Sequence, residues 1–243
     1  MLGLPDGVTA CLFDLDGVLT QTAKVHAAAW KTMFDEFLRE RSEREGAPFV
    51  PFEQADYDRW VDGKPREAGV RDFLASREIV LPEGERDDPP TAETVNGLGT
   101  RKNALVLRLI ADGGVEAYEG SIRYLHAVRD AGMRTAVVSS SNNCQAVLQA
   151  AGIEDLLEVR VDGLTAHAAG LHGKPAPDTF LAGASQLGFE PSQAVVFEDA
   201  LAGVAAGHAG RFGFVVGVNR VGQREALLAN GADIVVDDLS ELL

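Results

Sequence analysis

The sequence predicts an α/β protein with a Rossmann-like parallel sheet as its core and an inserted helical cap domain. A short apolar segment at 9–14 is followed much later, from residue 118 onward, by strand-like and helix-like segments that alternate to the C-terminus. Residues from about 21 to about 112 break this alternation, because their apolar side chains recur only at helical spacing. We therefore expect a core domain of residues 1–20 and 113–243 and a cap domain of residues 21–112.

The first strand is expected at Thr9–Asp14, where an apolar run typical of a buried strand ends in a carboxylate. The other core strands are expected at 135–139, 158–162, 194–198, 212–218 and 233–236, with helices at 121–131, 143–151, 178–187 and 200–209. Within the cap, one apolar stripe includes Met33 and Phe37 and another includes Val70 and Phe73. Two further helical pieces are expected around 52–61 and 100–111, set apart by turn clusters at Pro89-Pro90 and Gly97–Gly99.

Composition excludes several classes of protein. The 243 residues carry a formal net charge of −15, which argues against a nucleic-acid-binding surface. The N-terminus lacks the cationic flank and apolar core of a signal peptide, and no apolar run reaches the roughly 18 residues of a membrane span. Two cysteines, Cys11 and Cys144, stand outside any paired metal or disulfide pattern. We expect a cytoplasmic monomer with no nucleic-acid or membrane partner.

The clearest chemical signal is Asp14-Leu-Asp16-Gly at the end of the first predicted strand. Ligands of open α/β sheets bind outside the carboxyl ends of the strands, where both carboxylates would lie. Crowded acids need a cation or a proton to compensate their charge. A capped surface turn can have the same sequence, so this motif alone leaves both interpretations open.

Three later strand ends favour the functional interpretation. The run from Ser139 to Asn143 supplies donors for a phosphate oxygen from Ser139, Ser140, Ser141 and Asn143. Lys174 adds an ammonium in a proline-bounded segment, and Glu198-Asp199 forms a second acidic pair. Each has an ordinary alternative, namely a serine turn, a solvated lysine or a helix cap. Their presence at successive strand ends favours a phosphate and metal site.

Charge and ligand type specify the expected cofactor. Asp14, Asp16, Glu198 and Asp199 would contribute a charge of −4, and one Mg²⁺ with Lys174 would contribute +3. Binding of a phosphate dianion therefore requires a further cation or a protonated carboxyl. We assign that proton to Asp16. Oxygen-only ligands favour Mg²⁺ over zinc. The implied reaction is phosphoryl transfer through an aspartyl phosphate.

These four motifs resemble those of the haloacid dehalogenase superfamily, and the stretch from Phe13 to Lys31 resembles its β-phosphoglucomutase branch. The resemblance implies that Asp14 is the nucleophile and Asp16 the general acid and base. It further implies that Lys174 and Ser139 bind the transferring phosphate. The implied Mg²⁺ ligands are Asp14, Asp16 through its carbonyl, Glu198 and Asp199.

The resemblance also gives roles to three cap residues. Arg66, which with Lys64 brings two cations to a predicted helix start, is implied to hold the phosphate that is not reacting. Thr22 and His26, four residues apart on one helix face, are implied to support proton transfer at Asp16.

The chain departs from the branch at Gln21, Asp62 and Asn142, where the family usually has Asp, Lys and Lys. The change at Gln21 leaves the hinge between core and cap with one fewer acid. The changes at Asp62 and Asn142 alter charges near the expected substrate, so they bear on which sugar phosphate is accepted.

The expected function is therefore that of a β-phosphoglucomutase, which interconverts β-glucose 1-phosphate and glucose 6-phosphate through the 1,6-bisphosphate. A phosphatase of the same superfamily, acting on a sugar phosphate or another small molecule, is the alternative, because it uses the same core residues and delivers the phosphoryl group to water. A non-enzymatic phosphate-binding module is a third possibility, which the complete set of catalytic residue types disfavours.

Overall fold

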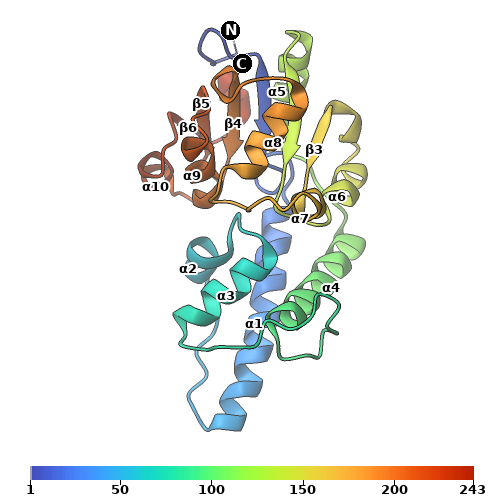
Figure 1. Cartoon of the computed structure of the whole chain (residues 1–243), viewed down its shortest axis with the longest axis vertical. Helices are drawn as coiled ribbons and strands as arrows, with labels where there is room; N and C mark the ends of the chain where they lie inside the picture. The colour runs from blue at the N-terminus through green and yellow to red at the C-terminus, as the bar shows by residue number, and fades with distance from the viewer. Residues whose placement is uncertain (1) are drawn as a thin grey trace. The chain divides into compact units, whose positions relative to one another are not determined.

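The computed structural model describes residues 2–243 and divides them into two compact units (Figure 1). The first unit contains residues 2–21, Gly63–Pro65 and Val115–Leu243, and the second contains Thr22–Asp62 and Arg66–Gly114. Across residues 2–243, no helix combines the length and the apolar character needed to cross a bilayer.

The first unit is built on a six-stranded parallel sheet, as the sequence predicts. Its strand order is β3-β2-β1-β4-β5-β6, so β1 lies in the middle, between β2 and β4. The strands are β1 (Ala10–Phe13), β2 (Arg134–Val138), β3 (Val159–Val161), β4 (Ala194–Glu198), β5 (Phe214–Val218) and β6 (Ile234–Val236). Phe13 is in register with both Val137 and Phe197, which brings the carboxyl ends of the three central strands to one edge.

Helices cover both faces of this sheet. Leu12 and Val196 belong to one apolar cluster with Phe180 and Val204, which lie on two of the helices. On the opposite side of the pleat, the ring of Phe197 contacts the ring of Tyr124 from a third helix. The helices of the unit are α5 (Glu119–Asp130), α6 (Cys144–Ala150), α7 (Gly163–Ala168), α8 (Asp178–Leu187), α9 (Leu201–Ala209) and α10 (Arg224–Ala229), with short 3-10 turns at Glu154–Leu156, Pro191–Gln193 and Leu239–Leu242.

The second unit is helical and has an aromatic core. It comprises α1 (Thr22–Glu45), α2 (Gln54–Asp56) with a π-helical turn at Tyr57–Val61, α3 (Arg66–Ser76) and α4 (Val95–Gly113). The ring of Phe34 lies 5.2 Å from that of Trp30, 5.0 Å from that of Phe52 and 4.2 Å from that of Phe73. Such contacts add to the burial of large apolar surface, so this unit has a hydrophobic core of its own.

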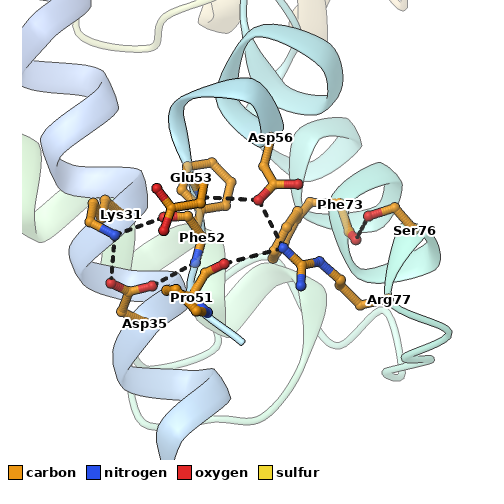
Figure 2. A network of polar contacts seen from close by, with 9 residues as sticks. All are labelled: Lys31, Asp35, Pro51, Phe52, Glu53, Asp56, Phe73, Ser76 and Arg77. Carbon is orange, nitrogen blue, oxygen red and sulfur yellow. Dashed lines mark hydrogen bonds and ion pairs between the residues drawn. The ribbon is translucent and has the colours of Figure 1, made fainter. Parts of the chain in front are cut away.

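A polar network attaches the irregular segment before α2 to the rest of the helical unit (Figure 2). The main chain of Phe52 donates to Asp35 on α1 at 2.8 Å and accepts from Lys31 at 2.7 Å. Arg77, which follows α3, donates to the carbonyl of Pro51 at 3.2 Å and to Asp56 of α2 at 2.8 Å. The backbone of a segment without regular structure is thus paired by side chains.

The turn predicted at Gly97–Gly99 is wrong, because both glycines lie within α4. Thr94 caps this helix by accepting from the backbone of Gly97 at 2.9 Å. A Cβ at Gly97 would lie 2.3 Å from the carbonyl oxygen of Ala92. The glycine therefore permits a close approach of the chain that precedes the helix, whereas the sequence analysis placed it in a turn between two helical pieces.

Candidate active site

Asp14 lies at the carboxyl end of β1, at the centre of the sheet. All four residues of β1 are buried, and the backbone of Asp14 continues the ladder by donating to Phe197 at 2.9 Å. The Asp14 side chain is nearly buried as well, at 8% exposed. An apolar strand therefore carries a carboxylate to the edge where α/β sheets bind ligands.

A tight turn after Asp14 holds Asp16. Gly17 has a left-handed φ of +94°, and its N–H donates to the carbonyl of Thr20 at 2.8 Å. A Cβ at Gly17 would lie 1.7 Å from Oδ2 of Asp199. Glycine is therefore required both by the turn and by the close approach of the second acidic pair.

Lys174 joins the two acidic segments. Its Nζ donates to Oδ1 of Asp14 at 2.5 Å, to Oε1 of Glu198 at 2.6 Å and to the carbonyl of Val138 at 3.0 Å. Burial disfavours the charged ammonium, but Asp14 and Glu198 together raise the pKa of Lys174 above its ordinary value. Lys174 is therefore held as a cation between two carboxylates.

Asp14, Glu198 and Asp199 form a buried cluster that fits a divalent cation. Each offers a carboxylate oxygen, and the three oxygens lie within 4.8 Å of one another. With all three ionised, Lys174 leaves two negative charges uncompensated, and the ligands are oxygens of the kind that Mg²⁺ prefers. The carboxylate of Asp16 lies outside this cluster.

Glu198 is fixed within the cluster by the helix that follows it. Its Oε2 accepts from the backbone of Ala200 at 2.9 Å, and a Cβ at Gly203 would lie 1.8 Å from its Oε1. Burial raises the pKa of Glu198 more than the neighbouring Lys174 lowers it. A bound cation would restore the ionised form.

The serine loop after β2 is ordered by its own hydroxyls. Ser139, which is buried, accepts from the backbone of Ser141 at 3.0 Å, and the hydroxyl of Ser141 accepts from the backbone of Asn143 at 3.1 Å. Ser140 instead donates to the carbonyl of Gly63 at 2.8 Å. The loop is therefore a pair of consecutive serine turns that opens α6.

Thr22 and His26 lie in the helical unit, on the first two turns of α1, and the structure adds Lys102 to them. Nζ of Lys102 lies 3.0 Å from Nδ1 of His26 and 4.9 Å from the ring centroid of Trp30. An ammonium only donates, so Nδ1 accepts and the neutral ring carries its hydrogen on Nε2. Burial and the Lys102 ammonium lower the pKa of His26 well below its ordinary value.

Lys102 is a functional candidate that the sequence motifs do not include, although its position on α4 carries a signal. Lys102 is four residues from both Leu98 and Val106, which are fully buried, so it lies on the apolar stripe of α4. A lysine at such a position needs a partner inside the fold.

Arg66 is the first residue of α3, directly after Pro65, and Lys64 groups with the first unit. Nε and Nη2 of Arg66 donate to Oε1 of Glu67 at 3.0 and 2.8 Å. Lys64 and Arg66 therefore lie at a helix start, as the sequence predicts, and Glu67 in the first turn pairs with Arg66.

Comparisons with known proteins identify the family of the chain and solved structures that share its fold. The haloacid dehalogenase-like hydrolase family matches residues 8–211. The chain is 56% identical to the β-phosphoglucomutase of Mycobacterium bovis, over 100% of this chain and 94% of that protein. It is 30% identical to a validoxylamine A 7'-phosphate phosphatase of Streptomyces hygroscopicus subsp. limoneus, over 95% and 94% of the two chains. The crystal structure of a β-phosphoglucomutase from Clostridium difficile shares the fold, with a TM-score of 0.75, 24% identity and coverage of 97% and 93%.

Proposed function

We propose, because the chain belongs to the haloacid dehalogenase-like hydrolase family, that it is a Mg²⁺-dependent phosphomutase that acts through an aspartyl phosphate on Asp14. The observation that carries this proposal is the contact of Lys174 with both Asp14 and Glu198 at the carboxyl end of the sheet. A nucleophilic carboxylate, a fixed cation and a cluster of metal-ligand oxygens are what phosphoryl transfer requires.

The residues of the core divide the chemical steps among them in this proposal. Asp14 attacks phosphorus, and Lys174 orients its carboxyl through the bond to Oδ1. Asp16 takes up and returns the proton of the sugar hydroxyl, a role worth about 10²–10⁴ in rate. Lys174 and the hydroxyl of Ser139 bind the oxygens of the transferring group.

The metal would be held by Asp14, Glu198, Asp199 and the carbonyl of Asp16. When bound, Mg²⁺ supplies positive charge to the oxygens of the transferring phosphoryl group and orients them.

The proposed substrate is β-glucose 1-phosphate. Phosphorylated Asp14 transfers its phosphoryl group to the 6-hydroxyl, which gives the 1,6-bisphosphate. The bisphosphate then reorients in the site and transfers its 1-phosphoryl group to Asp14. Glucose 6-phosphate is released. Similarity to the Mycobacterium bovis β-phosphoglucomutase over the full chain supports this choice. We assign the non-reacting phosphate to Arg66, Lys64, Ser140, Ser141 and Asn143.

Thr22 and His26 are proposed as supporting residues for proton transfer at Asp16. The contact of His26 with Lys102 supports this role, because it fixes the tautomer of the ring.

A phosphatase that uses the same core is the second candidate, favoured by the similarity to the Streptomyces enzyme. The test supplies β-glucose 1-phosphate, a trace of the 1,6-bisphosphate and Mg²⁺, and measures glucose 6-phosphate and inorganic phosphate separately. Formation of glucose 6-phosphate supports the mutase, and an Asp14→Asn variant should abolish it. Release of inorganic phosphate without glucose 6-phosphate would show that the protein is a phosphatase.

A further inference from the structure

The loop between β5 and α10, residues 219–223, reaches both acidic segments of the candidate site. Glu198 is in register with Gly217 of β5, so the chains that leave β4 and β5 run beside each other. This loop has no role in the mechanism proposed above. Two of its side chains, Arg220 and Gln223, nevertheless donate hydrogen bonds to backbone carbonyls of the acidic segments.

Arg220 contacts the turn that contains Asp16. Its Nε donates to the carbonyl of Gly17 at 2.7 Å, and its Nη1 donates to the carbonyl of Asp237 at 2.9 Å. The guanidinium lies 3.6 Å from the ring centroid of Tyr118, and the side chain is only 14% exposed. A planar cation held on several sides loses little freedom per bond, so its direction is well defined.

Gly17 is thereby held through both of its peptide groups. Its N–H, which belongs to the same peptide plane as the carbonyl of Asp16, donates to Thr20 at 2.8 Å. Its own carbonyl accepts from Arg220. Since Gly17 has a left-handed φ and no side chain to restrain it, these two bonds set the direction of the Asp16 carbonyl.

The same loop also contacts the other acidic segment. Nε2 of Gln223 donates to the carbonyl of Asp199 at 2.9 Å. The backbone of Gln223 is held in turn by Oδ1 of Asn219 at 2.7 Å. One short loop therefore spans two of the segments that supply oxygens to the proposed cation.

We infer that Arg220 is a positioning residue for the cation site, which it serves by holding the Gly17 carbonyl and hence the Asp16 peptide in a ligand-competent direction. This inference rests on the proposed function, in which the Asp16 carbonyl is a ligand. Arg220 also supplies a positive charge beside a strongly acidic site. These two effects of Arg220 predict opposite results. Removal of its positive charge alone would strengthen Mg²⁺ binding, whereas loss of the fixed direction of the Asp16 carbonyl would weaken it.

The experiment measures binding of Mg²⁺ alone to the full-length protein by calorimetry, without substrate, for the wild type, Arg220→Met and Arg220→Lys. Arg224→Met is the matched control, because Arg224 shares the contact with Asp237 but bonds Val235 in place of Gly17. We expect the Mg²⁺ dissociation constant to rise about 10-fold in Arg220→Met and to change less than about 2-fold in Arg224→Met. In turnover assays, kcat should fall with little change in KM for the sugar phosphate.

An unchanged or tighter dissociation constant in folded Arg220→Met, or an equal loss in Arg224→Met, would overturn the inference. If Arg220→Met does not fold, Arg220→Lys decides: about 3-fold weaker Mg²⁺ binding supports positioning, and wild-type binding overturns it. A wild type that binds Mg²⁺ but makes no glucose 6-phosphate refutes the mutase and leaves this result valid. A wild type that binds no Mg²⁺ refutes both.

Discussion

Nζ of Lys174 lies 2.5 Å from Oδ1 of Asp14, and the lysine side chain is 1% exposed. Both groups are removed from water, so each depends on the other for its charged form. The ammonium also bonds Glu198, which makes it the shared partner of a nucleophile and a metal ligand. The stability of the fold and the chemistry of the site are therefore linked through one side chain.

Replacement of Lys174 by methionine should lower the free energy of unfolding by about 3–5 kcal/mol in Mg²⁺-free buffer, because it leaves buried carboxylates without their cation. Urea unfolding measures this. Arg71→Met is the control, since Arg71 pairs with Glu83 at the surface and is 49% exposed, so its ion pair should contribute about 1 kcal/mol or less. Equal losses in the two variants would contradict the linkage.

Replacement of Gly203 by alanine should disturb Glu198 directly. The new Cβ would lie 1.8 Å from Oε1 of Glu198, so the carboxylate or α9 must shift. We expect the free energy of unfolding to fall by about 1–3 kcal/mol and Mg²⁺ binding measured by calorimetry to weaken. Gly113→Ala, where no atom lies within 4 Å of the added Cβ, should keep Mg²⁺ affinity and gain up to about 1 kcal/mol. Wild-type Mg²⁺ affinity in Gly203→Ala would refute the argument.

The sheet could be predicted from sequence because its elements have local signals. An apolar run that ends in Glu198 places β4 at its observed bounds. Asp178 at the start and Gly188 after the end do the same for α8. The turn predicted at Gly97 is wrong for a different reason. Residue propensity counts glycine as a helix breaker and does not register that glycine here allows the carbonyl of Ala92 to approach the first turn of α4.

The same distinction applies to the site. Asp14 follows β1 and Glu198 ends β4, and parallel strands bring their ends together, so the acidic cluster could be expected from the order of elements. The expectation that Lys174 lies at a strand end is wrong, because α7 separates it from β3. The partners of Lys102 and Arg220 could not be predicted, because they lie 76 and 203 residues away along the chain. Only the folded chain shows that His26 and Gly17 receive those side chains.

Replacement of Arg66 by alanine tests the proposed clamp for the second phosphate. We expect formation of glucose 6-phosphate to fall at least about 100-fold, since a bidentate cation for the non-reacting phosphate is lost. Labelling of Asp14 by acetyl phosphate, which has no second phosphate, should continue. Arg71→Ala on the same helix, where Arg71 forms an exposed ion pair with Glu83, should behave like the wild type. Unaltered mutase kinetics in Arg66→Ala would remove this assignment.

The lowered pKa of His26 predicts a specific pH dependence of stability. In the unfolded chain a histidine takes up its proton as the pH falls through about 6.5, whereas in the folded protein burial and Lys102 keep the ring neutral to lower pH. The unfolded state therefore binds more protons below about 6.5. The contribution of neutral His26 is fully present above that pH and is lost as the pH falls toward the folded pKa.

We therefore expect the free energy of unfolding of the wild type to fall between pH 6.5 and pH 5 by up to about 1.4 kcal/mol per pH unit more than that of His26→Gln. Urea titrations at matched ionic strength measure the difference. His126→Gln, which changes an exposed histidine on α5, is the control and should retain the wild-type slope. If the slopes of the wild type and His26→Gln are parallel, His26 titrates alike in the folded and unfolded chains. In that case the contact with Lys102 does not set its protonation state.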